Sequence, residues 1–449
     1  MTNNSHRSAA TDSAGSVARR AVSAVDRDVR SRVLATLTKK FGDLDLAEDA
    51  LQDAIAQALI TWSRTGVPDS PEAWLTTTAK RKALDVVRRE SVLAGKLARL
   101  HTESERASTP AEFRDPAEAP PPGLPDERLG MFFACTHPVL RAEDRVALTL
   151  RFVAGLTTAE VAHALLIPVP TTQQRIVRAK KRIGALGVPF APPREGDLPR
   201  RLGGVLRVIY LLFSEGFARS TGDAHIRDDL TGEAVALART LRALLPNAET
   251  TGLLALLLLT QSRRPARLDS DGRPVPLDDQ DRRLWDRALV AEGVALAEHA
   301  AAQADAGLYT IQAAIAAVHA EAATADETDW TQIAVLYRLL EVHDPGPVVR
   351  VGRAVAVGRA YGPARGIAML DRLQPDTQLD RFRPFHIARA LTLSELGDDR
   401  GAATAYRRAL ELPGNGAEDD YLADALSGLV TDPPRPDTDD PGNQRLSTP

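Results

Sequence analysis

The chain has 449 residues, enough for two to four domains of roughly 100–200 residues each, and its 44% hydrophobic and 26% charged residues are typical of a globular protein. A single cysteine, Cys135, excludes a disulfide within one chain and a zinc site built on cysteine pairs. The net charge of -4 divides unevenly, because residues 1–187 carry 27 Lys and Arg against 22 Asp and Glu, whereas residues 188–449 carry 29 against 38. Residues 1–187 can therefore bind a polyanion, whereas residues 188–449 would repel one.

Composition also indicates the fold class and the compartment. Aromatic residues are only 4% and Ala, Leu and Arg are abundant, which favours packed helices over sheets and predicts an all-α protein. The longest apolar run, "GLLALLLL" at 252–259, is about half of a membrane span and fits a buried helix. Residues 1–16 lack the apolar core of a signal peptide and read as a disordered N-terminus. We therefore expect a cytoplasmic protein without a membrane segment.

Residues 17–100 form the first predicted helical domain. "VRSRVLATLTKKFG" ends at Gly42, and "DLDLAEDALQDAIAQALITW" follows with apolar residues at helical spacing. These apolar residues are Leu46, Ala50, Leu51, Ala54, Ile55, Ala58 and Leu59. Gly66 and Pro68 break the pattern, and "SPEAWLTTTAKRKALDVVRRE" begins a further helix with Ser70 as its cap and Pro71 in its first turn.

Residues 101–125 are a proline-rich acidic linker, and 126–187 are a second helical domain. In "LTTAEVAHALLIP" Thr158 can cap a short helix to about Leu165, and a tight connection leads to a second helix. That second helix has two possible starts, either with Pro170 in its first turn or one residue later with Thr171 and Gln174 as a capping box. The arrangement predicts a helix-turn-helix.

The second helix of this pair, "VPTTQQRIVRAKKRI", has five cationic side chains and no acidic one. We expect three apolar residues to pack inward and the polar residues to lie mostly outward. The inward set is Ile176, Ala179 and Ile183, and the outward set is Thr172, Gln173, Arg175, Arg178, Lys180, Lys181 and Arg182. Thr, Gln and Arg suit base edges and phosphates in a major groove. A solvated helix whose cations favour its own C-terminal dipole is the plainer interpretation of a basic helix taken alone.

The rest of the chain is predicted to be helical. We divide it into an extension at 197–300, repeats at 301–430 and a disordered tail at 431–449. A turn at Asp271-Gly272 makes a short hairpin possible within 264–283. The segments 353–373 and 389–410 resemble each other with an offset of 35 or 36 residues. Helix, glycine turn and helix at that spacing are typical of tetratricopeptide repeats.

Three quoted segments, taken in order, carry a family resemblance. "DLDLAEDALQDAIAQALITW", "PEAWLTTTAKRKALDVVRRE" and "RVALTLRFVAGLTTAEVAHALLIPVPTTQQRIVRAKKRI" resemble regions 2 and 4 of the extracytoplasmic-function (ECF) RNA polymerase sigma factors, over about residues 28–187. The remainder, including "YLLFSEGFARSTG", resembles the extension of a sigma subgroup with a tetratricopeptide-like domain. Residue Phe217 stands where related chains often have Tyr, which puts a hydroxyl role there in doubt.

The resemblance implies roles for three groups of residues. An acidic helix face would contact the clamp helices of the largest polymerase subunit, through Asp45, Glu48, Asp49 and Asp53. The -10 promoter element would be bound by Ser63, Arg64, Thr77, Lys80, Arg81, Lys82, Arg88 and Arg89, with the loop 63–69 capturing a flipped base. The -35 element would be read by Thr171, Thr172, Gln174, Arg175, Arg178 and Lys181. Trp62 and Trp74 lie near the base-capturing loop, but core packing suits them better. Pro170 leaves the register of the base contacts open.

The implied partners are core RNA polymerase, promoter DNA and a protein partner of the C-terminal helices, with no cofactor and no metal. A one-component helix-turn-helix regulator with a sensing solenoid is the alternative, although it leaves the match at 40–90 unexplained. An enzyme is disfavoured, because no HExxH, GxSxG, Walker or GxGxxG motif occurs. The acidic residues near 269–281 are better interpreted as loop caps and arginine partners.

Overall fold

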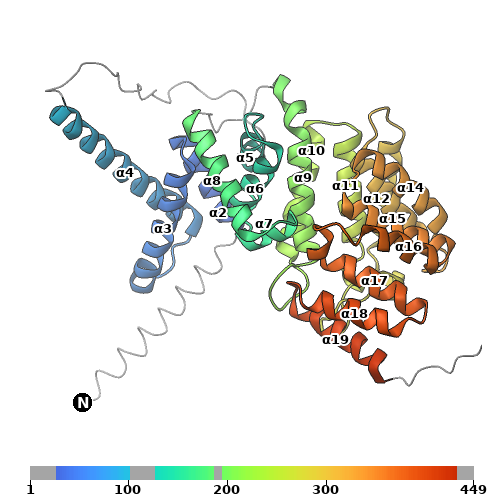
Figure 1. Ribbon diagram of the computed structural model, residues 1–449. Helices are drawn as coiled ribbons and strands as arrows, with labels where there is room; N and C mark the ends of the chain where they lie inside the picture. Colours follow the sequence, from blue (N-terminus) through green and yellow to red (C-terminus); the bar gives the residue numbers. More distant parts are fainter. Residues whose placement is uncertain (1–26, 102–126, 187–194, 432–449) are drawn as a thin grey trace, which may run out of the picture. The chain divides into compact units, whose positions relative to one another are not determined.

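The computed structural model describes residues 27–101, 127–186 and 195–431 (Figure 1). Within these ranges the regular elements are helices, and β-structure is limited to two isolated bridges, which confirms the all-α prediction. The predicted N-terminus (1–16), the linker (101–125, apart from His101) and the tail (431–449, apart from Thr431) lie outside the described residues. None of the described helices is both long and apolar enough to cross a membrane.

The chain divides into two compact units that are discontinuous in sequence. Unit 1 comprises residues 1–216 and 228–254, and unit 2 comprises residues 217–227 and 255–449. The first helices after the predicted helix-turn-helix therefore belong to the same unit as that motif.

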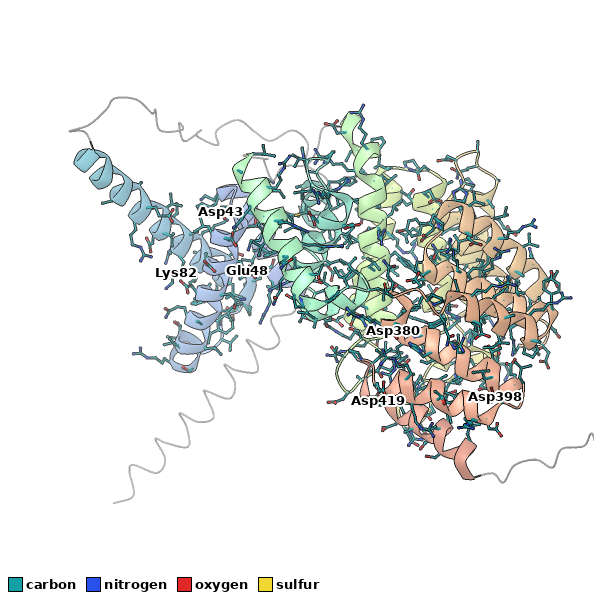
Figure 2. The ribbon with its side chains drawn as sticks, viewed as in Figure 1. Asp43, Glu48, Lys82, Asp380, Asp398 and Asp419 are labelled. Carbon is teal, nitrogen blue, oxygen red and sulfur yellow. The ribbon has the colours of Figure 1, made fainter. Side chains whose placement is uncertain are left out.

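Unit 1 begins with three helices, α2 (Arg27–Phe41), α3 (Leu44–Thr65) and α4 (Pro71–His101). Gly42 ends α2 as predicted, with φ 71° and its amide donating to Thr38 O at 2.8 Å. Asp43 then caps α3 by accepting hydrogen bonds from two amides of its first turn (Figure 2). The buried stripe of α3 includes Ala54, Ala58 and Trp62. Leu59, one of the apolar residues at helical spacing, is 39% exposed because it lies beside that stripe.

The second part of unit 1 contains four short helices, α5 (Glu127–Cys135), α6 (Ala142–Phe152), α7 (Thr158–Ala164) and α8 (Val169–Ala185). Their core is built on fully buried Phe132, Phe133 and Leu148. The Ser31 hydroxyl of α2 donates to Val153 O at 2.8 Å, so the two parts of unit 1 are joined by a buried hydrogen bond. Burial raises the pKa of the Cys135 thiol to about 12, which keeps it protonated and unreactive.

Unit 1 continues through a short turn η1 (Glu195–Asp197) and the helices α9 (Leu198–Phe217) and α10 (Asp228–Leu244). Arg201 of α9 donates to Phe133 O at 3.0 Å. A Cβ at Gly216 would lie 2.7 Å from Leu230 Cβ, so glycine allows α9 and α10 to meet closely. The boundary between the units falls within α11 (Ala248–Gln261), whose leucines at 253, 254 and 256–259 are buried as predicted.

Unit 2 is a succession of helices that follow an irregular segment. That segment contains η2 (Arg264–Ala266), η3 (Leu277–Asp279) and η4 (Arg282–Leu284). The helices are α12 (Arg287–Ala301), α13 (Leu308–Glu321), α14 (Trp330–His343), α15 (Pro347–Tyr361), α16 (Pro363–Leu373), α17 (Arg383–Glu395), α18 (Asp399–Leu410) and α19 (Gly416–Thr431), with η5 (Leu379–Arg381) before α17 (Figure 1). The predicted hairpin reduces to one bridge, Leu268 to Pro274, around a turn at Gly272 with φ 79°.

Two helix pairs correspond to the two similar segments of the sequence. Gly362 (φ 102°) separates α15 from α16, and Gly397 (φ 77°) separates α17 from α18. The core of this region is a series of separate clusters, built in turn on Ile333, Leu370 and Tyr406. Each pair therefore buries its apolar faces mainly against its neighbours, as stacked helical repeats do.

The close contact between α15 and α16 predicts that one added methyl group lowers the stability of unit 2. A Cβ at Gly366 of α16 would lie 2.9 Å from the Gly358 Cα of α15. We expect Gly366→Ala to destabilise unit 2 by about 1–3 kcal/mol, because two helix backbones must separate. Chemical denaturation monitored by circular dichroism measures the change.

Gly428→Ala is the matched control for this substitution. Gly428 also lies inside a helix of unit 2, but a Cβ there meets no atom within 4 Å. Alanine at 428 should leave stability unchanged or raise it by about 0.5–1 kcal/mol through helix propensity. Equal effects of the two substitutions would contradict the importance of the contact between α15 and α16.

Candidate nucleic-acid interface

The helices α7 and α8 form a helix-turn-helix. Thr157 caps α7, since its hydroxyl accepts from the Glu160 amide at 3.2 Å while the Glu160 carboxylate accepts from the Thr157 amide at 2.7 Å. This reciprocal capping box corrects the predicted cap by one residue, from Thr158 to Thr157. Leu166, with φ 53°, makes the turn between the helices. The turn fixes where α8 begins.

Helix α8 begins at Val169 with Pro170 in its first turn. The alternative start, with Thr171 and Gln174 as a capping box, does not occur, because Pro168 occupies the N-cap. Thr172 is fully buried and its hydroxyl donates to Pro168 O at 3.2 Å. Its predicted outward position was therefore wrong, and its side chain stabilises the start of α8.

The two faces of α8 otherwise separate as predicted, except that the side chains of Arg175 and Lys180, expected to lie outward, are only 17% and 16% exposed. Ile176, Ala179 and Ile183 are buried. The exposed face comprises Gln173, Gln174, Val177, Arg178, Lys181 and Arg182. Thr171 and Arg175 are half-buried. Arg175 is ion-paired with Glu143 at 2.8 Å and Arg178 with Asp144 at 3.4 Å, so α6 orients two of the predicted -35 residues.

A second cationic surface lies along α4. Thr77, Arg81, Arg88 and Arg89 are exposed, whereas Lys80 and Lys82 are half-buried. Figure 2 labels Lys82. Asp85 lies near this surface, 4.0 Å from Arg88, and its backbone carbonyl accepts from Arg89. Such a helix can contact phosphates along one side.

The segment between α3 and α4 differs from its prediction. Ser63 and Arg64 lie in the last turn of α3, and the loop begins only at Gly66, whose φ of 84° ends the helix. The Ser63 hydroxyl donates to Ile60 O at 2.8 Å. Trp62 is 2% exposed and packs edge-on against Trp74, with ring centroids 5.4 Å apart, so the core role preferred for Trp62 is confirmed.

The acidic face of α3 is divided between exposed and paired carboxylates. Asp49 and Asp53 are exposed, together with Ile60. Asp45 is ion-paired with Lys180 of α8, and Glu48 lies 3.7 Å from the same ammonium group and 3.2 Å from Arg151 (Figure 2).

Lys180 was predicted to lie outward, and its side chain is only 16% exposed. Its ammonium group lies 4.6 Å from the centre of the Phe152 ring, in addition to its two carboxylate partners. Lys180 thus connects the two parts of unit 1. Helical periodicity cannot predict this contact, because it joins distant segments of the sequence.

The histidines of unit 2 and the acidic residues near 269–281 have separate local surroundings. His299, His319 and His343 lie on different helices, and no group of three metal-ligating side chains occurs among the described residues. Asp281 caps η4 and binds Arg283, while Asp278 is ion-paired with Arg359 at 2.7 Å. These acids are loop caps and arginine partners, as the sequence indicated.

The comparisons with known proteins match the parts of this interface. Residues 26–92 match Sigma-70 region 2, residues 134–183 match Sigma-70 region 4, and residues 201–301 match a family of unknown function, DUF6596. The chain is also 40% identical over 407 residues to "Uncharacterized protein R00370" of Rhizobium meliloti (strain 1021), covering 90% of this chain and 95% of that protein. No solved structure matches significantly.

Regions 2 and 4 in one chain, followed by a large helical part, define a sigma-70 type of transcription initiation factor. This protein belongs to the sigma-70 family and shares nearly its whole length with the Rhizobium meliloti protein.

Proposed function

We propose that this protein is a sigma factor of the ECF type, which binds core RNA polymerase and directs it to promoters by reading -10 and -35 elements. The observation that carries the proposal is the combination, within unit 1, of two cationic helix faces on α4 and α8 with an acidic face on α3. The cationic faces of α4 and α8 can bind the phosphates of nucleic acid, and the acidic face of α3 can bind a basic surface of another protein. The expected location is the cytoplasm, where these partners are found.

We propose that α8 and α4 bind different promoter elements. Exposed Gln174, Arg178 and Lys181 of α8 would meet duplex DNA at the -35 element, with an amide suited to base edges and cations suited to phosphates. Arg81, Arg88 and Arg89 of α4 would contact phosphates at the -10 element. Two modest contacts in one molecule reinforce each other through effective concentration, so promoter selection needs both.

The ion pairs that α8 and α6 form with α3 suggest how the free protein would change when it binds polymerase. Lys180 and Arg151 occupy Asp45 and Glu48, two of the four carboxylates proposed to contact polymerase. We propose that core polymerase replaces these cations with its own, and that α8 is thereby released for the -35 element.

Reversing the exposed acidic charges of α3 tests the polymerase assignment. We expect Asp49→Lys with Asp53→Lys to weaken binding to core RNA polymerase at least tenfold, because two attractive contacts become repulsive. Fluorescence anisotropy of the labelled protein, titrated with core polymerase without DNA, measures the affinity. Asp399→Lys with Asp420→Lys is the control, with the same charge change at exposed positions of unit 2.

The same titration separates the sigma role from that of a one-component regulator. A one-component regulator would bind duplex DNA alone and would not bind core polymerase in the absence of DNA. Failure of the unmodified protein to bind core polymerase would contradict the proposed function.

We further propose that the C-terminal helices are a tetratricopeptide-like regulatory extension. The helix pairs on either side of Gly362 and Gly397 support this interpretation. Val335, Leu339 and Val342 of α14 are 44%, 47% and 79% exposed at helical spacing, which suits a protein partner.

Truncation tests whether the extension masks unit 1. A chain ending at Gln261 retains α9 to α11 and should bind promoter DNA more tightly if the extension masks unit 1. Unchanged or weaker binding would contradict masking.

A further inference from the structure

Unit 2 contains a group of arginines whose charges have no carboxylate partner. Arg263 and Arg267 lie on either side of η2, and Arg282 begins η4. None of the three takes part in an ion pair among the described residues. This occurs in the part of the chain where acidic residues outnumber basic ones, 38 to 29.

A phenylalanine ring holds two of these guanidinium groups together. The Arg267 Cζ lies 3.8 Å from the centre of the Phe217 ring, and the Arg263 Cζ lies 5.5 Å from it. The ring attracts both cations without neutralising either one. Both arginines are half-buried as whole residues, and burial of their guanidinium groups is the main cause that lowers the pKa of each.

The hydrogen-bond partners of Arg267 are neutral. Its Nε donates to Phe217 O at 3.2 Å, and its Nη2 lies 3.0 Å from His225 Nε2. Burial and the neighbouring Arg267 lower the pKa of His225 to about 4, so this imidazole is neutral and accepts the hydrogen bond. Glu418 is a nearby acid, but it is 3.3 Å from Arg383 Nε, to which it is ion-paired.

The hydrogen-bond partners of Arg282 are also neutral, although the charges of Asp278 and Glu327 oppose the lowering of its pKa by burial. Arg282 donates to two backbone carbonyls, of His319 and Ala322, each at 2.7 Å, and to the hydroxyl of Thr328 at 2.9 Å. The Nε of Arg263 and the Nδ1 of His319 are buried and have no hydrogen-bond partner among the described residues. Burial lowers the pKa of Arg263 to about 10, with Arg282 as the second cause.

Arg383 shows how the same unit treats a structural arginine. It is 2% exposed and its guanidinium is ion-paired with Glu418 and Asp419 (Figure 2). Leaving a charge partly buried without a partner costs several kcal/mol, and neighbouring like charges add to that cost. The Nε and Nη1 of Arg383 also lack a hydrogen-bond partner among the described residues, so the feature that sets Arg263 and Arg267 apart is the missing ion pair. An anion from outside the chain would supply one.

We propose that Arg263 and Arg267, held on Phe217 and supported by Arg282, form a binding site for the phosphate groups of a small molecule. Guanidinium groups bind phosphate oxygens through paired N–H donors, and two guanidinium groups near one ring suit a ligand with more than one negative charge. Such a ligand supplies the negative charge that the site lacks. The site is independent of the proposed sigma role, so either can fail without the other.

Pyrophosphate and inorganic phosphate are the probes, used with the full-length protein. We expect pyrophosphate to raise the thermal midpoint in a saturable way, and more strongly than phosphate, because it engages both guanidinium groups. Sodium chloride at matched ionic strength is the control. An equal shift with chloride, or no shift with either phosphate probe, would overturn the proposal.

Charge-removing variants separate a binding site from a structural role. Arg263→Gln and Arg267→Gln should each weaken pyrophosphate binding at least tenfold by calorimetry, and should raise the midpoint without ligand, since an unpaired cation is removed. Arg283→Gln is the control, because this neighbouring arginine has a side chain that is 89% exposed and is ion-paired with Asp281. Undiminished binding in the Arg263 and Arg267 variants would refute the site.

A measurement on the unmodified protein avoids any dependence on how the variants fold. Phenylglyoxal modifies accessible arginines, and mass spectrometry locates the modified residues. Pyrophosphate should protect Arg263 and Arg267 from modification while Arg283 reacts at the same rate. Equal modification of all three residues with and without pyrophosphate would contradict the assignment.

Discussion

Replacing Arg178, Lys181 and Arg182 by alanine should weaken promoter binding through the -35 element by roughly one to two orders of magnitude at low salt. All three side chains lie on the exposed face of α8. Each lost phosphate contact should reduce the dependence of log affinity on log salt by about 1, so the slope should fall by about 3. Anisotropy titrations of the holoenzyme with promoter DNA over a range of salt concentrations measure both quantities.

The control for this prediction removes three cations elsewhere. Arg338, Arg372 and Arg400 are exposed residues of unit 2, and their replacement by alanine gives the same change in net charge. The control protein should keep the slope of the unmodified protein. If both triple variants lose the same affinity, the effect comes from overall charge, and α8 is not the DNA-contacting helix.

Trp62→Ala should cause the largest loss of stability of the single substitutions considered, about 3–5 kcal/mol. The indole is 2% exposed, lies at the end of the buried stripe of α3 and packs edge-on against Trp74. Its removal leaves a cavity between α3 and α4, the helices that carry the acidic face and the proposed -10 contacts. Urea denaturation followed by circular dichroism measures the loss.

Leu59→Ala is the comparison for the tryptophan variant. Leu59 precedes Trp62 by one turn of α3 and is 39% exposed, so its truncation should cost less than about 1 kcal/mol. A loss at Leu59 as large as that at Trp62 would mean that the buried stripe of α3 is misassigned. The Trp62 and Leu59 variants together therefore test which side of α3 is buried, and hence which side carries the exposed acidic residues.

The sequence predicted the inward face of α8 well, but it did not predict the burial of Thr172, Arg175 and Lys180. The spacing of Ile176, Ala179 and Ile183 identifies the inward face, which the structure confirms. Thr172 precedes Ile176 by four residues and continues that stripe, but a polar residue on a basic helix was interpreted as a DNA contact. The apolar spacing was the better guide, because position on a helix decides burial before residue type does.

Contacts between distant segments could not be predicted from one sequence. The ion pair of Lys180 with Asp45 joins residues on different helices, and periodicity describes only neighbours on the same helix. The hydrogen bond between Arg267 and His225 is another such contact, because His225 precedes Arg267 by 42 residues. Helix type and most boundaries follow from local pattern, whereas these pairings depend on how the helices pack.

The discontinuity of the two units has a consequence for synthesis and for proteolysis. Residues 217–227 belong to unit 2 and are held by its far end, since Asn415 Nδ2 donates to Arg219 O at 2.8 Å and the Gly416 amide donates to Gly222 O at 3.0 Å. A nascent chain cannot complete unit 2 until the residues around Asn415 have left the ribosome. In the finished protein, a protease cut between the units near residue 254 leaves the C-terminal fragment attached by these bonds, so nicking alone does not detach unit 2.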